Sequence, residues 1–263
     1  MRQQYHFMAG LPRSGSTVLA SILNQNPAVY VTPTSPLLDL LYLNEQAWRK
    51  APSVISNPIP SQVESISQGI IRGCWAHVPQ NIIIDKHRAW AKNLRTIEYI
   101  FKKEPKVIMT HRDIPSILAS FLTLLHNTNQ SPHYIDQALL QRNLPLNDEN
   151  RVDILWNYYV KEGCEQFNMA IQTNRSAVLI VEYDVLIQYK KETLSKVYDF
   201  LELPPWEHDF DNIENKTADD DLVAWGLEGL HTIRPKLEKV AKTPQEILGE
   251  KIFSKYKDIK LHY

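Results

Sequence analysis

The stretch Tyr5-His-Phe-Met-Ala-Gly10-Leu-Pro-Arg-Ser-Gly-Ser-Thr17 begins as a buried strand and ends in a hydroxyl-rich helix start. Successive backbone N–H groups at a helix N-terminus bind anions, and the helix dipole favours negative charge there. Gly15 allows the backbone to approach a phosphate closely, while the hydroxyls of Ser14, Ser16 and Thr17 are further donors. The stretch therefore predicts a strand, a phosphate-binding loop and a helix. A turn that only caps a helix is the alternative.

The loop departs at one position from the pattern G-x-x-x-x-G-K-[ST] of nucleotide triphosphatases. Both glycines and the last hydroxyl residue fit, but Ser16 occupies the lysine position and the cation lies inside the loop, at Arg13. A loop without that lysine is poorly suited to stabilising a γ-phosphoryl group together with Mg²⁺. Asp85 is the only strand-end aspartate with a conceivable metal role, and we expect no metal site.

Short apolar runs alternate with amphipathic segments along the rest of the chain. Continuous apolar runs predict the buried strands of a mostly parallel sheet with helices on both faces. We expect strands at 5–9, 82–84, 106–109 and 177–182, and helices at 16–24, 36–48, 63–75, 94–101, 115–125, 152–172 and 194–201. The expected fold is α/β, a P-loop-like three-layer domain with a central, mostly parallel sheet flanked by helices. Such sheets bind ligands beyond the carboxyl ends of their strands.

Composition and charge exclude several classes of protein. Hydrophobic residues make up 43% and charged residues 22% of the 263 residues, as in an ordinary globular protein. A net charge of −1 leaves no global basic surface, so we expect no nucleic-acid partner. Cys74 and Cys164 are too few for a disulfide framework and lack the spacing of a metal site. We find no apolar stretch long enough for a signal peptide or membrane anchor, and we expect a cytoplasmic protein without a membrane partner.

A second anion site is indicated where the strand at 106–109 ends. Arg112 would lie at the carboxyl end of this strand, and Ser120 about two turns into the following helix. A guanidinium and a hydroxyl in these places bind one phosphate together. The alternative is an ion pair between Arg112 and Asp113, with Ser120 buried in helix packing.

These motifs resemble those of the sulfotransferases that use PAPS (3′-phosphoadenosine 5′-phosphosulfate). Pro-Arg-Ser-Gly-[Ser/Thr]-Thr after an N-terminal strand looks like their 5′-phosphosulfate loop, especially in the bacterial branch related to tyrosylprotein sulfotransferases. Arg112 with Ser120 is similar to their 3′-phosphate site. Tyr183 matches a residue that contacts adenosine, although a packed tyrosine bonded to backbone is equally open. The resemblance implies PAPS as donor, PAP as product and no metal, and two phosphate sites suit PAPS better than ATP.

Sulfonyl transfer requires fixed cations near the sulfonate oxygens and the leaving phosphate. Arg13 in the loop and Lys86 at a strand end are the two candidates. The stretch Asp85-Lys86-His87-Arg88-Ala89-Trp90 looks like the Asp-Lys-x-Arg-x-Trp of bacterial relatives. By this resemblance Lys86 lies near the bridging oxygen of the donor, and a solvated strand-end lysine is the alternative.

The general base stays open among Asp39, His87 and His231. In tyrosylprotein sulfotransferases a glutamate follows the loop helix; Thr34 stands at that position here, and no carboxylate is nearer than Asp39. In cytosolic relatives the base is a histidine two residues after the lysine, whereas here His87 follows it directly. Neighbours in an extended chain point to opposite faces, so we expect His87 to point away from the donor if Lys86 points towards it.

His231 is the third candidate and lies in a Gly-Leu-His-x-Ile-Arg stretch that resembles a C-terminal signature of bacterial relatives. A histidine with a pKa near neutral can act as a base or orient the acceptor. Arg234 and the lysines at 236, 239 and 242 are expected to close over the 3′-phosphate, unless the lysines form an ordinary solvated basic face.

We therefore predict one sulfotransferase domain over 1–263, with insertions near 44–81 and 127–148 and a donor-covering loop near 206–242. The polar stretch 127–148 is expected to be a lid or substrate loop. The expected reaction is in-line transfer of sulfonate from PAPS to a hydroxyl or amine of a small-molecule or peptidyl acceptor. A homodimer is left open. A nucleotide kinase or triphosphatase and a non-catalytic nucleotide-binding module are the competing hypotheses.

Overall fold

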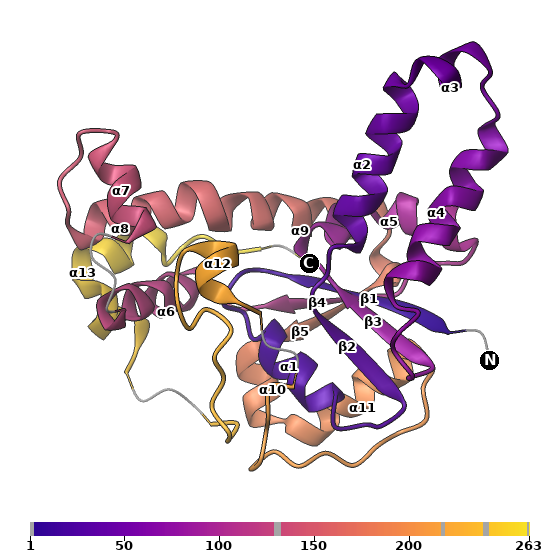
Figure 1. Cartoon of the computed structure of the whole chain (residues 1–263). Coiled ribbons are helices and arrows are strands. Elements are labelled where there is room, and N and C mark those ends of the chain that lie inside the picture. The colour runs from indigo at the N-terminus through magenta and orange to yellow at the C-terminus, as the bar shows by residue number, and fades with distance from the viewer. Residues whose placement is uncertain (1–2, 129–132, 217–218, 239–241, 262) are drawn as a thin grey trace.

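The computed structural model describes residues 3–128, 133–216, 219–238, 242–261 and 263 (Figure 1). Its centre is a sheet of five strands, β1 Gln4–Gly10, β2 Val29–Thr34, β3 Ile82–Lys86, β4 Val107–His111 and β5 Val178–Glu182. The strand order is β2-β3-β1-β4-β5 and every neighbouring pair is parallel. The predicted α/β class is confirmed. The strand β2 was not predicted; it is an edge strand that contains Pro33, and proline is tolerated only at edges because it lacks a backbone N–H.

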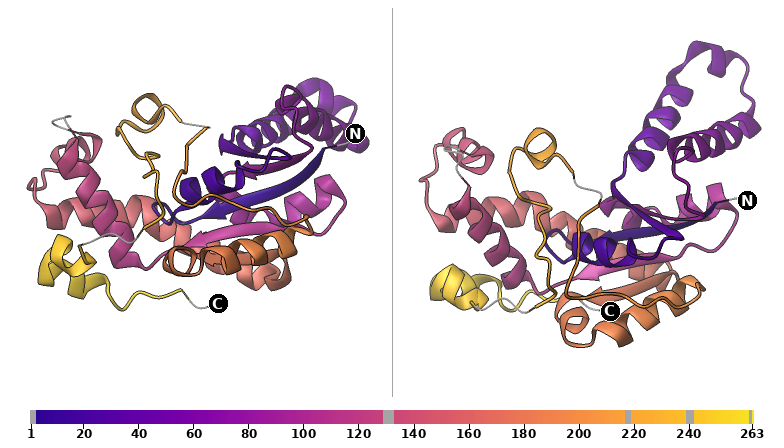
Figure 2. Two further views of the ribbon diagram at one scale, coloured as in Figure 1. Left: turned by 90° about the horizontal axis from the view of Figure 1, so that it is seen from below. Right: turned by 60° about the horizontal axis from the view of Figure 1, so that its bottom comes forward.

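Helices cover both faces of the sheet, because side chains along each strand alternate between two buried clusters. On β1, Phe7 packs into the larger cluster and Met8 into the smaller one, and both are fully buried. The larger cluster lies against α2 Leu37–Lys50, α4 Pro60–Cys74, α5 Leu94–Phe101, α6 Ile114–Asn127, α9 Lys161–Thr173 and α13 Pro244–Tyr256. The smaller cluster lies against α1 Ser16–Leu23, α10 Tyr183–Gln188 and α11 Lys190–Leu201 (Figures 1 and 2).

Two predicted insertions are helical. The segment 44–81 completes α2, forms the short helix α3 Pro52–Ser56 and continues through α4, and this hairpin projects from the body (Figure 1). The stretch 127–148, expected as a helical or loop insertion, contains α7 Tyr134–Leu140. His133 begins this helix by accepting a hydrogen bond from the backbone N–H of Asp136 at 3.2 Å, and Ile135 and Leu139 are fully buried beneath it. Apolar anchoring therefore overrides the polar composition of the stretch.

The helix expected at 152–172 is continuous but irregular. It consists of α8 Asp148–Leu155, a π-helical turn at Trp156–Val160, and α9. Turns of this kind inside α-helices are frequently found at functional sites.

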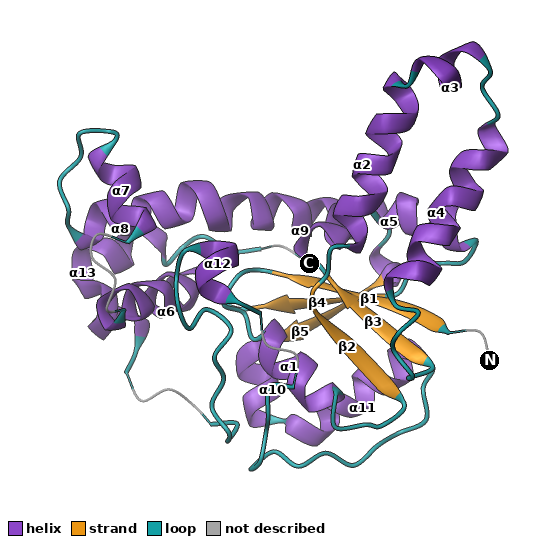
Figure 3. Cartoon of the chain, in the orientation of Figure 1, coloured by secondary structure: helices purple, strands orange, loops and turns teal. Residues whose placement is uncertain are grey.

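The chain beyond α11 crosses the carboxyl edge of the sheet as a long loop with one short helix, α12 Asp221–Trp225 (Figure 3). The loop pairs with itself, because Ile213 donates to the carbonyl of Pro235 at 2.6 Å and Leu237 donates to that of Phe210 at 3.0 Å. In the described parts of the chain, no helix is both long and apolar enough to cross a membrane.

Candidate active site

A cavity of about 650 Å³ opens at the carboxyl ends of the strands. Its walls come from the loop after β1, the end of β3, α6, the π-helical turn, α9, the start of α10 and the loop around α12. All but one of the residues assigned to the site from the sequence line it, namely Arg13, Gly15, Ser16, Thr17, Lys86, Arg112, Ser120, Tyr183, His231 and Arg234.

Ser14 is the exception. Its side chain is buried away from the cavity, and its hydroxyl bonds the carbonyl of Leu11 and the hydroxyl of Thr110, each at 2.6 Å. The expectation that this hydroxyl donates to a bound anion is therefore wrong. It attaches the loop to β4, because a buried hydroxyl must find hydrogen-bond partners within the protein.

Glycine is required at Gly15 by both conformation and space. Its φ of 89° lies in the left-handed region, and a Cβ atom there would lie 2.4 Å from Cδ2 of Tyr183. Tyr183, the first residue of α10, lies with its ring against the loop and carries the guanidinium of Arg112 4.5 Å from the ring centroid. The loop, Tyr183 and Arg112 thus form one continuous wall of the cavity.

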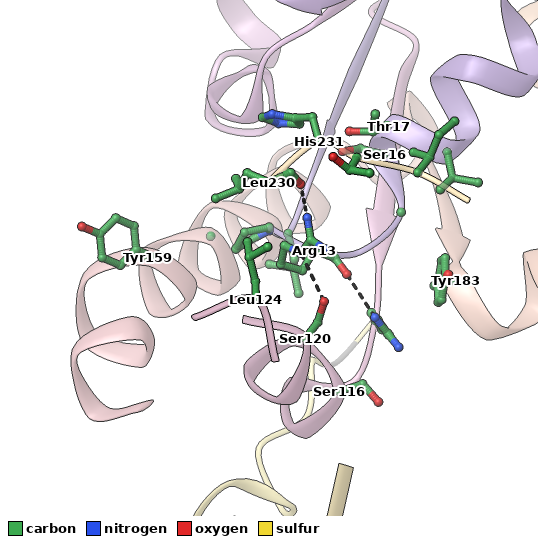
Figure 4. A pocket seen from close by; sticks show the side chains of 18 of the residues that line it. Arg13, Ser16, Thr17, Ser116, Ser120, Leu124, Tyr159, Tyr183, Leu230 and His231 are labelled. Carbon is green, nitrogen blue, oxygen red and sulfur yellow. Dashed lines mark hydrogen bonds between the residues drawn. The ribbon is translucent and has the colours of Figure 1, made fainter. Parts of the chain in front are cut away.

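Arg13 is held at the centre of the site (Figure 4). Its Nε donates to Oγ of Ser120 at 3.2 Å, and another guanidinium nitrogen donates to the carbonyl oxygen of Leu230. Burial and the neighbouring Arg112 lower the pKa of Arg13. Two guanidinium groups this close repel each other, which favours an anion between them.

Arg112 is not engaged by its neighbour Asp113, whose carboxylate instead accepts from the backbone N–H of Ser116 at 2.9 Å and caps α6. Within the described chain the Nε atom of Arg112 is buried without a hydrogen-bond partner. A buried donor in this state is costly unless a ligand satisfies it. The ion-pair alternative for Arg112 is therefore not observed.

Lys86 and Asp85 end β3 on opposite sides of the sheet edge. Lys86 lines the cavity, and burial lowers its pKa while Asp219 and Asp221 raise it. Asp85 is fully buried and accepts hydrogen bonds from the indoles of Trp75 and Trp90, at 2.9 and 2.7 Å. The aspartate and tryptophan of the Asp-Lys-x-Arg-x-Trp stretch thus form a structural pair. No cluster of potential metal ligands occurs among the residues that the structure describes.

His87 and Lys86 both line the cavity, and the expectation that their side chains point to opposite faces stays a prediction. His87 still has an extended backbone (φ −151°, ψ 131°), and its Nδ1 caps the 3₁₀ helix η1 Arg88–Lys92 by accepting from the backbone N–H of Ala89. Its Nε2 lies 3.7 Å from the carboxylate of Asp39 on α2. Asp39 itself is not part of the cavity wall.

His231 is paired with two carboxylates that the sequence reasoning passed over. Its Nδ1 lies 2.5 Å from Asp221 and 3.5 Å from Asp219. Asp219 also accepts hydrogen bonds from the backbone N–H and hydroxyl of Thr34, at 2.9 and 3.2 Å. Thr34 is the position where a catalytic glutamate was sought, so a carboxylate reaches that place from the C-terminal loop. The acidic run 219–221 was the available signal.

Basic residues of the same loop complete the wall. Arg234, Lys236 and Lys242 line the cavity, and Lys236 also lies 3.2 Å from Asp211. Lys239 lies outside the described residues.

Known proteins share this sequence pattern and fold. The family model described as "Sulfotransferase family" matches residues 6–208. A putative protein-tyrosine sulfotransferase of Caenorhabditis briggsae is 24% identical over 210 residues, which cover 76% of this chain and 66% of that protein. The chain thus spans slightly less than two thirds of that relative's length.

Two solved structures extend the comparison. The sulfotransferase domain from the curacin biosynthetic pathway superposes with a TM-score of 0.51 at 16% identity, covering 100% of this chain and 93% of that one. Mouse sulfotransferase SULT7A1, in complex with PAP, gives 0.51 at 14% identity, covering 98% and 83%. At these identities the structural matches establish a common fold.

Proposed function

The chain belongs to the sulfotransferase family, and on this premise we propose that it moves a sulfonate group from PAPS to a hydroxyl or amine and releases PAP. One observation carries the proposal. Arg13, Lys86 and Arg112 come from three different strand ends, yet they line one cavity at the N-terminus of α1. A cavity with this concentration of cations suits a donor with several anionic groups.

The donor is bound by two anion sites. The 5′-phosphosulfate is bound by Arg13, by the hydroxyls of Ser16 and Thr17, and by backbone N–H groups of the loop, including those of Ser14 and Gly15. The 3′-phosphate is bound by Arg112, Ser120 and Arg234, with Lys236 and Lys242 near it, and Tyr183 contacts the adenosine. Support comes from the unsatisfied Nε of Arg112 and from the repulsion between Arg13 and Arg112, since a phosphate relieves both.

Sulfonate transfer forms a bond between the acceptor oxygen or nitrogen and sulfur while the bond from sulfur to the bridging oxygen breaks. In-line geometry places the acceptor opposite the leaving phosphate. Lys86 stabilises the negative charge that develops on the bridging oxygen, and Arg13 stabilises that on the sulfonate oxygens.

The acceptor proton passes to Nε2 of His231. An ionised carboxylate only accepts hydrogen bonds, so Asp221 at 2.5 Å holds the proton of neutral His231 on Nδ1 and leaves the lone pair on Nε2. This arrangement favours His231 as the base over His87 and Asp39. The Nδ1 of His87 already accepts from the backbone N–H of Ala89 and its Nε2 faces Asp39, and Asp39 itself lies outside the cavity wall.

The acceptor is a small molecule or a peptidyl group, and the protein acts in the cytoplasm. The second point is supported by Cys74 and Cys164, which are free cysteines, as is usual where thiols are kept reduced.

Thermal shifts with PAP, with ATP plus Mg²⁺, and with AMP test the donor. We expect stabilisation specific to PAP, and Arg13→Ala and Arg112→Ala should each remove most of it. If both variants keep full PAP affinity, the donor site is wrongly assigned. Stabilisation by ATP only with Mg²⁺ favours a kinase or triphosphatase, and PAP binding without turnover of labelled PAPS favours a non-catalytic module.

A further inference from the structure

The cavity extends beyond the proposed donor site. Figure 4 places Tyr159 and Tyr183 on opposite sides of Arg13, so one end of the cavity is free of the adenosine contact. The helix η1, with Arg88 and Lys92, forms one wall of this free end. The π-helical turn and the start of α9, with Tyr158, Tyr159 and Glu162, form another.

Charges at this free end are not balanced. Glu162 is the acidic residue of its wall, and its carboxylate lies 3.5 Å from Nζ of Lys92 and accepts from the amide of Gln166 at 2.8 Å. Glu162 is thus engaged by two neighbours. Glu162 also attracts the guanidinium of Arg88 electrostatically, but the side chain of Arg88 makes no hydrogen bond or ion pair within the described chain, although it lines the cavity. One guanidinium therefore remains available to a ligand.

Arg88 lies close in sequence to Lys86, which is proposed to stabilise the leaving phosphate. Arg88 follows Lys86 by two residues, so the two backbone positions lie within about 7 Å of each other. Since Arg88, Lys86 and His231 line one cavity, a small acceptor whose anionic group is bound by Arg88 can reach the space between Lys86 and His231. A guanidinium fork fits the two oxygens of a carboxylate.

We propose that the acceptor is a small hydroxy- or amino-carboxylic acid whose carboxylate is bound by Arg88. This inference rests on the proposed function, since it names the substrate class of the same site. Tyr158 and Tyr159 contribute aromatic surface and hydroxyl groups beside the bound acid. The irregular helical turn that presents them is typical of a functional position.

The test measures binding to the PAP-loaded protein by calorimetry. The probes are 3-hydroxybutyrate, 4-hydroxybenzoate and N-acetylserine, each compared with its methyl ester, and 4-hydroxyphenyl phosphate. We expect at least one acid to bind tenfold or more tightly than its ester, as a charge-assisted hydrogen bond allows. Arg88→Gln should abolish this preference and Arg88→Lys should keep part of it. Arg95→Gln, which removes an exposed charge outside the cavity, should leave it unchanged.

Each outcome decides the proposal. It is overturned if no acid is preferred over its ester, if Arg88→Gln keeps the preference, or if the phosphate ester binds more tightly than every acid. Measuring PAP binding first on the same samples distinguishes failure of the proposed donor site from failure of the proposed acceptor class. If the wild-type protein does not bind PAP, the donor assignment is contradicted. If it binds PAP but shows no preference for acids over esters, only the acceptor class is contradicted.

Discussion

Arg13 and Ser120 are joined by a hydrogen bond of 3.2 Å from Nε to Oγ, although 107 residues separate them along the chain. The bond connects the loop after β1 to helix α6, and it therefore links the two proposed phosphate sites. Leu230, from the C-terminal loop, accepts a further hydrogen bond from the same guanidinium. One side chain thus holds three segments of the site together.

Because of this link, we expect Arg13→Ala and Ser120→Ala to be coupled in their effect on PAP affinity. Each single variant should weaken PAP binding by roughly tenfold or more, since each removes a charge-assisted hydrogen bond. The double variant should lose less than the sum of the two losses, by about 0.5–3 kcal/mol. Dissociation constants of all four proteins give the coupling directly. Strictly additive losses would show that the two phosphate sites act independently.

The pairing of Asp221 with His231 predicts that a change at Asp221 lowers kcat without weakening PAP binding. Asp221→Asn removes the charge that keeps the proton on Nδ1, so kcat should fall by about 10²–10⁴-fold while PAP affinity is retained. Asp220→Asn is the matched control. Asp220 caps α12 by accepting from the backbone N–H of Val223 at 3.1 Å, and asparagine keeps that acceptor. Equal turnover in the two variants would show that the charge of Asp221 is not needed to fix the proton on Nδ1 of His231.

The close contact between Gly15 and Tyr183 predicts that adding a methyl group at position 15 lowers the stability of the protein. Gly15→Ala places a Cβ 2.4 Å from the Tyr183 ring at a φ of 89°, and we expect a loss of about 1–3 kcal/mol in the free energy of unfolding, with weakened PAP binding. Gly69→Ala on α4 meets no atom within 4 Å and should be neutral or stabilising by up to about 1 kcal/mol. Urea denaturation compares them, and a wild-type midpoint for Gly15→Ala would contradict the contact.

Asp85 predicts an unusual dependence of stability on pH. Burial raises its pKa to about 6, against hydrogen bonds from Ser35, Trp90 and Trp75 that lower it. The folded state therefore binds more protons than the unfolded state between pH 4 and 6, and stability contributed by Asp85 decreases as pH rises through this window. Relative to Asp85→Asn, which cannot titrate, the wild-type protein should lose up to about 3 kcal/mol from pH 4 to 6.

The control for Asp85 lies in the same titration. Above pH 6 the difference between wild type and Asp85→Asn in the free energy of unfolding should become constant. If the wild-type protein instead gains stability relative to Asp85→Asn from pH 4 to 6, the hydrogen bonds outweigh burial and the pKa of Asp85 is not raised.

Sequence alone determined the strand, loop and helix at 4–23, the α/β class and the candidate cations, because these depend on local backbone requirements. Apolar runs predict buried strands, Gly15 predicts a close approach of the backbone to a ligand, and a helix N-terminus favours an anion. The same local rules did not locate α7, where buried anchors outweigh polar composition, and they missed β2, whose strand character depends on its edge position.

Tertiary structure alone decided which side chains surround the candidate active site. The acidic run 219–221 is visible in the sequence, but the fold decides that Asp219 reaches Thr34, 185 residues earlier, and that Asp221 bonds His231. The tertiary structure also turned the hydroxyl of Ser14 away from the cavity, because that hydroxyl bonds Thr110 on β4. Long-range packing decides which side chains line one cavity, and the sequence of a single segment does not specify which distant segments pack against it.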